Sequence, residues 1–269
     1  MNSATSVAMS IAGSDPSGGA GLQADIKTFH QHGVYATTVV TLLTVQNSQS
    51  VSAVEMVGSD FVLAQLDAIL ADIPPICAKT GALGSAEMIA VIADRAANFH
   101  FPLVVDPVMI SKHGQSLIDD QAVGVLIERL LPKAYVVTPN RKEAERLAGI
   151  EIRSREDMVR AVKTITDLGA ANVVIKGGRH EDQSVDLLWT DGRPYWLVDR
   201  WIETKALHGS GCVFSASITA RLAKGESLLT AVENAKRFIS AAIRDAPGLG
   251  RGFGPVNMMK NTPTFETIR

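Results

Sequence analysis

Residues 7–32 of the chain read VAMSIAGSDPSGGAGLQADIKTFHQH. A short apolar run at 7–12 is followed by a glycine-rich segment at 13–21 and by a helical pattern at 22–32. The same alternation of apolar runs and helical patterns continues along most of the chain. Runs that are continuously apolar are typical of strands buried on both faces of a parallel sheet. The sequence therefore predicts an α/β fold, a three-layer α/β/α sandwich around a mostly parallel central sheet.

The other predicted elements follow from the same patterns. Further strands are predicted at residues 37–44, 76–79, 103–106, 135–138, 173–176, 185–189 and 195–198. Further helices are predicted at residues 60–71, 86–99, 120–130, 142–148, 155–168, 213–223 and 228–244. Residues 190–194, TDGRP, indicate a hairpin turn between two strands. We expect a single domain over residues 1–269, because no linker, repeat or low-complexity segment divides the chain.

The composition favours small-molecule chemistry. The chain has 269 residues, a net charge of -2 and no basic run, which argues against a nucleic-acid surface. Two cysteines, Cys77 and Cys212, make no disulfide framework, and Cys77 lies in an apolar run typical of a core. The N-terminus lacks a signal-peptide pattern, and no apolar stretch is long enough to span a bilayer. We expect a cytoplasmic protein without membrane partners.

Polar and glycine-rich segments come directly after the predicted strands. They follow Ala12, Thr44, Lys79, Val105, Thr138 and Lys176. Ligands of open parallel sheets bind beyond the carboxyl ends of the strands. We therefore expect one ligand site at this edge of the sheet.

The segment His208-Gly209-Ser210-Gly211-Cys212 leads directly into a helical pattern. Backbone N–H groups in a first helical turn have no partner within the helix, and the helix dipole attracts anions to them. This turn is therefore a candidate phosphate site, although glycine turns before helices are common. A cysteine at the first helical position feels the same dipole, so we expect a lowered pKa for Cys212. An anion site beside a base suggests phosphoryl transfer.

The glycine-rich segment at 13–21 matches neither a P-loop nor the dinucleotide-binding pattern. Its glycines either allow a tight turn or let the backbone approach a flat ligand. Asp25, in the helix that follows, is either a solvated carboxylate or a group that accepts from an amino substituent. Gln46 ends a predicted strand, where a carboxamide can pair with an amino group and the adjacent ring nitrogen. A strand-end glutamine is otherwise unremarkable.

Three further strand ends carry charged or amide side chains. Asp106 can help to hold a hydrated Mg²⁺. Asn140 and Glu143 lie in the first turn of a helix, where acidic residues also stabilise the helix itself. Lys176 precedes two glycines and suits a phosphate contact, unless it simply extends towards solvent before a turn.

Taken together, five segments in this order resemble one family. They are AGSDPSGGAG at 12–21, DPV at 106–108, TPN at 138–140, KGG at 176–178 and HGSGC at 208–212. The chain resembles the hydroxymethylpyrimidine/phosphomethylpyrimidine kinases of thiamine biosynthesis, which have a ribokinase-like fold. The match runs from about residue 7 to residue 255. Each segment is weak evidence alone, whereas the ordered set is specific.

The resemblance implies phosphorylation of 4-amino-5-hydroxymethyl-2-methylpyrimidine, and then of its monophosphate, with ATP and Mg²⁺ as cofactors. By analogy with the family it also implies a homodimer, and the lengths between the five segments indicate only a small lid. The pyrimidine pocket would be lined by Gly13, Asp25, Gln46, Ala82 and Val108. Asn140 and Lys176 would serve the triphosphate, and Glu143, together with Asp106, the Mg²⁺. An anion hole would be formed by Gly209, Ser210 and Gly211.

Cys212 stands where most ribokinase-like enzymes have an aspartate base. Only the first acceptor is an alcohol that must lose a proton, so we expect Cys212 to matter mainly in the first step. Two residues depart from the usual family pattern. Ser210 replaces a threonine but keeps the hydroxyl, and Ala82 replaces a methionine and leaves the pocket wall looser.

Two other functions remain open alongside this one. Pyridoxal is also a flat ring with a hydroxymethyl group, so a pyridoxal kinase is the nearest alternative. Gln46 favours the aminopyrimidine, because pyridoxal has no amino group beside its ring nitrogen. A ligand-binding protein without activity is the other alternative, although Cys212, Lys176 and Glu143 are all retained.

Overall fold

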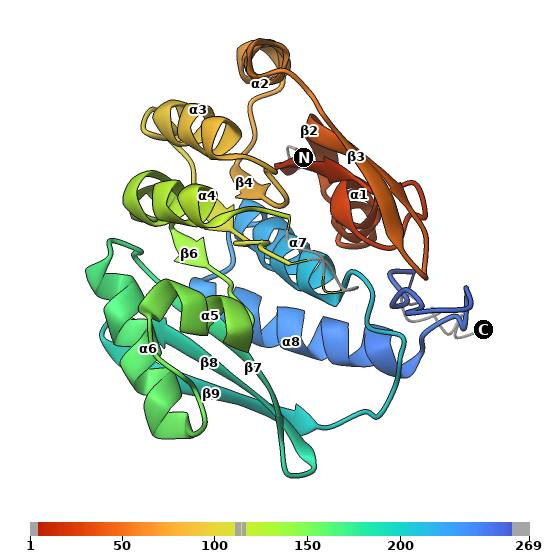
Figure 1. Cartoon of the computed structure of the whole chain (residues 1–269), viewed down its shortest axis with the longest axis vertical. Coiled ribbons are helices and arrows are strands. Elements are labelled where there is room, and N and C mark those ends of the chain that lie inside the picture. The colour runs from red at the N-terminus through yellow and green to blue at the C-terminus, as the bar shows by residue number, and fades with distance from the viewer. Residues whose placement is uncertain (1–4, 111–113, 115–116, 260–269) are drawn as a thin grey trace, which may run out of the picture.

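The computed structural model describes residues 5–110, 114 and 117–259. Within these residues nine strands form one sheet in the order β3-β2-β1-β4-β5-β6-β7-β8-β9 (Figure 1). The strands are β1 (Val7–Ser14), β2 (Tyr35–Gln46), β3 (Val51–Met56), β4 (Cys77–Thr80), β5 (Leu103–Val105), β6 (Val136–Val137), β7 (Val173–His180), β8 (Gln183–Thr190) and β9 (Arg193–Arg200). The central strands from β2 to β7 run parallel, and β3, β8 and β9 are antiparallel additions at the two edges.

Helices cover both faces of this sheet, which confirms the predicted three-layer sandwich. One layer contains α1 (Gly21–Gln31), α7 (Ser210–Ala223) and α8 (Leu228–Arg244). The other contains α2 (Ser59–Asp72), α3 (Ala86–Ala96), α4 (Asp120–Val125), α5 (Arg141–Ala148) and α6 (Arg155–Asp167). Figure 1 shows α7 and α8 side by side, and α5 close to α6.

The central strands are apolar throughout because successive side chains enter two different cores. Met9 and Ile11 pack among α2 to α6, whereas Ala8 packs among α1, α7 and α8. Likewise, Val104 packs in the core beside α1, α7 and α8, and Val105 packs in the core beside α2 to α6. Cys77 is fully buried, as predicted. The continuous apolar pattern is thus the direct result of burial on both faces.

The structure differs from the predicted elements in three places. β2 extends to Gln46 and pairs with the antiparallel strand β3, which the sequence analysis did not predict. The helix predicted at 120–130 divides into α4, a π-helical turn at Leu126–Leu130 and a 3₁₀ turn at Leu131–Lys133. Proline at position 132 cannot donate to an α-helical ladder, which accounts for the tighter ending. The strand predicted at 135–138 is only two residues long.

The predicted turn between β8 and β9 is confirmed. Thr190 pairs with Arg193, and the two intervening residues, Asp191 and Gly192, have φ angles of 52° and 70°. Two positive φ angles are the requirement of the two-residue hairpin turn that matches strand twist. No helix in the described part of the chain is long and apolar enough to cross a membrane.

Candidate active site

Side chains from the carboxyl ends of several strands meet the first turns of α1 and α7. His208 lies 2.8 Å from Asp15, just after β1, and 3.4 Å from Gln46 at the end of β2. Lys176 on β7 lies 3.3 Å from Asp106, which follows β5. The polar strand ends and the segment before α7 are therefore neighbours in space, although they are far apart in the sequence.

Two glycines at the start of α7, Gly209 and Gly211, lie against other segments of the site. Gly209 is the N-cap with a φ of 74°, and a Cβ there would overlap the carbonyl oxygen of Gly19. A Cβ at Gly211 would lie 3.3 Å from Lys176 Nζ. The two glycines thus bring the glycine-rich segment and a lysine ammonium against the start of one helix.

The N–H groups of this first turn are candidates for binding an anion. Ser210 N–H already donates to the Leu207 carbonyl at 3.2 Å, and Val213 N–H donates to Gly209 at 2.9 Å. By the geometry of a first helical turn, the N–H groups of Gly211 and Cys212 are the ones that have no carbonyl within the helix. An anion held there would also lie beside Lys176.

The pKa prediction for Cys212 is wrong. α7 begins at Ser210, so Cys212 is the third helical residue, and it is half-buried. Burial raises the pKa of the Cys212 thiol to about 11; Asp25 adds to this, while Lys79 and an N–H bond from Gly21 oppose it. Loss of hydration disfavours the thiolate more than the helix N-terminus favours it. The resting side chain is a thiol at neutral pH.

Asp25 is the second correction. Its carboxylate is fully buried, accepts from Lys79 Nζ at 2.8 and 2.9 Å, and accepts from the Ser10 hydroxyl at 2.6 Å. It is therefore neither solvated nor placed to read a substrate amino group, because its oxygens already have partners inside the protein. Burial alone would lower the pKa of Lys79, but Asp25 raises it, so this lysine stays charged.

A second lysine–carboxylate pair, Lys176 and Asp106, also acts electrostatically on Cys212. Asp106 accepts from the Ser215 hydroxyl at 3.0 Å and lies 3.3 Å from Lys176 and 3.4 Å from the Thr138 hydroxyl. Burial would lower the pKa of Lys176, but the neighbouring Asp106 and Glu143 raise it. The Lys176 side chain keeps 18% of its surface exposed, so it can reach a ligand from where it stands.

Asn140 and Glu143 form a capping box at the start of α5. Glu143 N–H donates to the Asn140 side chain at 3.0 Å, and Asn140 N–H donates to Glu143 at 2.8 Å. Burial raises the pKa of Glu143 to about 7, although Lys176 acts against the rise. The helix-stabilising interpretation of both residues is therefore supported. A role in binding Mg²⁺-triphosphate stays a prediction.

The donor set near Lys176 fits a hydrated Mg²⁺. The described residues contain no cluster of three or more His, Cys, Asp or Glu that could hold a metal ion by themselves. Mg²⁺ is commonly held by one or two carboxylates together with waters and substrate phosphates. Asp106 and Glu143, which influence each other electrostatically, are such a pair.

Asp15 and His208 are two site residues to which the sequence analysis gave no role. Asp15 accepts from Ser17, Ala20 and His208, and both Asp15 and His208 are buried. Burial would raise the pKa of Asp15, but the hydrogen bonds from His208 and Ser17 lower it below its usual value. Both residues could have been found from the sequence, because each lies inside a glycine-rich segment that was already a candidate part of the site.

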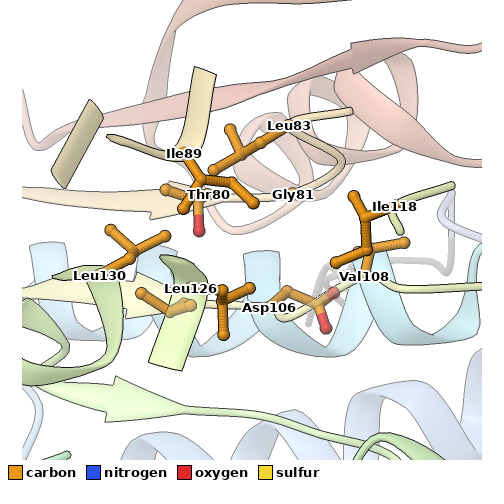
Figure 2. Close-up of a pocket in the computed structure, with 10 residues that line it drawn as sticks. Thr80, Gly81, Leu83, Ile89, Asp106, Val108, Ile118, Leu126 and Leu130 are labelled. Atoms are coloured by element: carbon orange, nitrogen blue, oxygen red, sulfur yellow. The ribbon is translucent and has the colours of Figure 1, made fainter. Parts of the chain in front are cut away.

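The remaining predicted substrate residues are Val108, Gly13 and Ala82. Val108 lines a cavity of about 10 Å³ together with Thr80 and Asp106 (Figure 2), room for roughly one water molecule. The buried Thr80 hydroxyl has no hydrogen-bond partner within the described residues. Gly13 packs against Leu42, and the Ala82 carbonyl accepts from Thr41 at 2.7 Å. This cavity is too small for a pyrimidine ring.

Comparison with known proteins identifies the family. Residues 15–257 match the model of the phosphomethylpyrimidine kinase family. A hydroxymethylpyrimidine/phosphomethylpyrimidine kinase from Synechococcus elongatus is 43% identical over 255 residues, 94% of this chain and 97% of that protein. The thiamine biosynthesis bifunctional protein ThiED of Geobacter sulfurreducens is 48% identical over 93% of this chain. The chain spans about half, 51%, of that longer relative.

Solved structures agree on the fold. A pyridoxal kinase from Staphylococcus aureus, in complex with AMP-PCP and pyridoxal, has a TM-score of 0.88 at 37% identity and covers 96% of this chain and 94% of its own. A phosphomethylpyrimidine kinase from Clostridium difficile has a TM-score of 0.79 at 40% identity, covering 89% of this chain and 100% of its own. This chain is therefore a kinase with the ribokinase-like fold, and it belongs to the phosphomethylpyrimidine kinase family.

Proposed function

We propose that this chain transfers the γ-phosphoryl group of ATP, with Mg²⁺, to the hydroxymethyl group of 4-amino-5-hydroxymethyl-2-methylpyrimidine. In a second turnover it phosphorylates the resulting monophosphate to the diphosphate, as a step towards thiamine diphosphate. The observation that carries the proposal is the turn before α7. At this turn a helix N-terminus lies beside the Lys176 ammonium, which interacts electrostatically with Cys212, and His208, which precedes the turn, contacts Gln46.

Phosphoryl transfer depends mainly on positioning and on neutralising the charge of the transferred group. The N–H groups of Gly211 and Cys212 would donate to its oxygens, and Lys176 would supply a positive charge beside them. Asp106 and Glu143 would hold Mg²⁺ through its waters, with Asn140 near the triphosphate. The metal would neutralise the phosphate oxygens.

Cys212 is proposed as the group that accepts the proton of the substrate alcohol. Its raised pKa means that the thiol must first lose a proton itself, which makes it an inefficient base in the resting site. A phosphate acceptor in the second step is already ionised. The two steps are therefore expected to depend differently on Cys212.

Pyridoxal is the second candidate substrate, because the pyridoxal kinase has the higher TM-score of the two structures, 0.88 against 0.79. Gln46 favours the aminopyrimidine. Its carboxamide can donate to a ring nitrogen and accept from the adjacent amino group, and pyridoxal lacks that pair of groups.

The test is ATP consumption by purified protein with Mg²⁺ and each of three acceptors: the hydroxymethylpyrimidine, its monophosphate and pyridoxal. Turnover of both pyrimidines with little turnover of pyridoxal is the expected result. A preference for pyridoxal would overturn the substrate assignment while retaining the kinase site. Absence of turnover with all three would contradict the proposal and favour a protein that only binds its ligand.

We also propose that residues 1–269 act as one catalytic domain in the cytoplasm, with small molecules as the main partners. A homodimer is proposed by analogy with the family. The antiparallel pair of β2 and β3 is proposed as the small lid, because it extends from the strand that carries Gln46. Sedimentation of the purified protein measures the oligomeric state directly.

A further inference from the structure

We propose that Lys236 and Asp186 form a positioning pair for Lys176, in which Asp186 holds the backbone that follows Lys176 on β7. Neither residue has to touch the nucleotide. The inference rests on the proposed function, since it concerns the lysine proposed to meet the transferred phosphate. It assigns a role to a buried lysine of α8 and a buried aspartate of β8 that the proposed reaction does not use.

Lys236 and Asp186 form a closed ion pair. Lys236 Nζ donates to Asp186 Oδ2 at 2.7 Å and to the Ser184 hydroxyl oxygen at 2.8 Å. Each of the two charged side chains is only 9% exposed. A buried ion pair is often no more stabilising than apolar side chains of similar volume in the same place. Stability alone is therefore a weak reason for this pair.

The other carboxylate oxygen of Asp186 binds the backbone of β7. Gly177 N–H donates to Asp186 Oδ1 at 3.1 Å. Asp186 stands opposite Lys176 in the ladder between β7 and β8, and the register of this ladder shifts between Lys176 and Arg179. A β-bulge bends its strand and re-aims the side chains beside it. The Asp186 carboxylate therefore holds the strand at the residue that follows Lys176.

The backbone around Lys176 is thus held from both sides. On the side of β6, Lys176 N–H donates to the Pro139 carbonyl oxygen at 2.9 Å. On the side of β8, the contact is the hydrogen bond from Gly177 to Asp186. A lysine side chain is a flexible stem that ends in a point charge. The position of its backbone therefore decides which groups the Lys176 ammonium can reach.

Loss of the Asp186 acceptor would move this backbone away from β8. A Cβ at Gly177 would lie 2.4 Å from the Val185 carbonyl oxygen, so the strand already packs closely against β8. Without the carboxylate, the Gly177 N–H would turn towards water instead. Lys176 would move with it, and a misplacement of about 1 Å is enough to weaken a positioning contact strongly.

The test compares two double variants that remove the same charges and differ in one acceptor. They are Lys236→Met/Asp186→Asn, the Asn variant, and Lys236→Met/Asp186→Leu, the Leu variant. Asparagine keeps an oxygen for the Gly177 N–H, whereas leucine has none. Both variants also lose the charge of Lys236 near Asp199, so this effect cancels in the comparison. Urea denaturation of each variant measures whether it is folded.

Nucleotide binding, measured by calorimetry, is the readout. Each protein is titrated with AMP-PCP, an analogue of ATP, in the presence of Mg²⁺, and with AMP, which lacks the β- and γ-phosphates. We expect wild type and the Asn variant to prefer AMP-PCP over AMP to the same degree. In the Leu variant this preference should fall by about tenfold, the effect of weakening one contact to a charged group. Lys176→Met is the reference for complete loss of the contact.

Two outcomes separate this inference from the proposed function. Equal preferences in the Asn and Leu variants, with a reduced preference in Lys176→Met, would overturn the inference and keep Lys176 at the phosphate site. An unchanged preference in Lys176→Met would remove Lys176 from that site and overturn the inference with it. Because neither titration contains a phosphoryl acceptor, failure of the pyrimidine assignment changes neither result.

Amide hydrogen exchange in wild-type protein provides a test that needs no variant. The Gly177 N–H should exchange at least about 10²-fold more slowly than an amide of an unstructured chain, because Asp186 holds it. Its exchange rate is measured by NMR. Exchange as fast as in an unstructured chain would overturn the inference even if the Leu variant does not fold.

Discussion

Two lysine–aspartate pairs act electrostatically on Cys212, and they differ in how tightly they are closed. Lys79 and Asp25 are 2.8 Å apart and both side chains are fully buried. Lys176 and Asp106 are 3.3 Å apart, with the lysine side chain 18% exposed and the aspartate 3%. Asp25 has no surface from which to meet a ligand. Asp106 and Lys176 lie at the edge of the site, beside the first turn of α7.

This difference in burial and distance indicates that one pair is structural and that the other belongs to the reactive site. A closed pair with short bonds to both carboxylate oxygens can exchange neither partner for a substrate group without leaving a buried charge. A longer and partly exposed pair can turn its lysine from the carboxylate to a phosphate at low cost. We therefore interpret Lys79–Asp25 as a fixed structural pair, and Lys176–Asp106 as a pair that changes partners during the reaction.

The largest expected effect comes from opening the closed pair. Lys79→Met leaves the Asp25 carboxylate buried without its counter-ion, so the free energy of unfolding should fall by about 3–5 kcal/mol. Urea denaturation at neutral pH measures this change in the free energy of unfolding. The double variant Lys79→Met/Asp25→Leu should recover most of the loss, because it leaves no unpaired charge.

A surface pair is the control for this experiment. Arg153 and Glu151 are largely exposed, and Arg153→Met should change the unfolding free energy little. A Lys79→Met protein as stable as wild type would show that water reaches Asp25. The distinction between the two buried pairs would then fail.

The next effect concerns the open pair and appears in activity more than in stability. Lys176→Met removes a positive charge from the proposed phosphate site, so kcat for both phosphorylation steps should fall by about 10²–10³-fold. The loss of unfolding free energy should be smaller than for Lys79→Met. Steady-state kinetics and urea denaturation on the same samples check both. A variant with full activity would remove Lys176 from the site.

The contrast between the pairs also explains what could be predicted from the sequence. The sheet could be predicted because burial on both faces leaves a local signal, as at Val104 and Val105. The partner of Asp25 could not, because Lys79 is 54 residues away along the chain. A lysine inside a short apolar run was a usable signal, since a buried lysine needs a partner. Asp15 and His208 are 193 residues apart, and no local pattern joins them.

Cys212 shows a different limit of sequence analysis. A helix N-terminus is visible in a sequence, and its effect on a thiol is to lower the pKa. Burial is visible only in three dimensions, and here it has the larger and opposite effect. The sequence singled the residue out as a candidate, which stays a prediction, but the direction of its pKa shift was predicted with the wrong sign.

Cys212 interacts electrostatically with both pairs, so its replacement tests them jointly. Cys212→Ala should lower kcat for the first phosphorylation by about 10²-fold and affect the second step much less, because only the alcohol acceptor needs a base. In wild type the first step should become faster as pH rises above neutral towards the thiol pKa of about 11. The second step should lack this rise. Equal losses in both steps, or the same pH profile for both, would contradict the base role.

The smallest expected effect comes from Glu143, the second acid beside Lys176. Its pKa is about 7 in the folded protein against an ordinary value of 4.5. Between these values the folded state keeps a proton that the unfolded state releases, so stability should decrease as pH rises from about 4.5 to 7 and stay level above it. Glu143→Gln removes this titration but keeps an oxygen for the Asn140 N–H.

The variant should therefore gain stability relative to wild type as pH rises through that window, by on the order of 1–3 kcal/mol. Urea denaturation at pH 4.5, 6 and 8 measures the difference, with Glu156→Gln, an exposed first-turn position of α6, as the matched control. Equal pH slopes for wild type and Glu143→Gln would mean that Lys176 already neutralises Glu143 in the folded state. Lys176 would then be held by two carboxylates, Asp106 and Glu143. The Lys176–Asp106 pair would be no more available to bind phosphate than the Lys79–Asp25 pair.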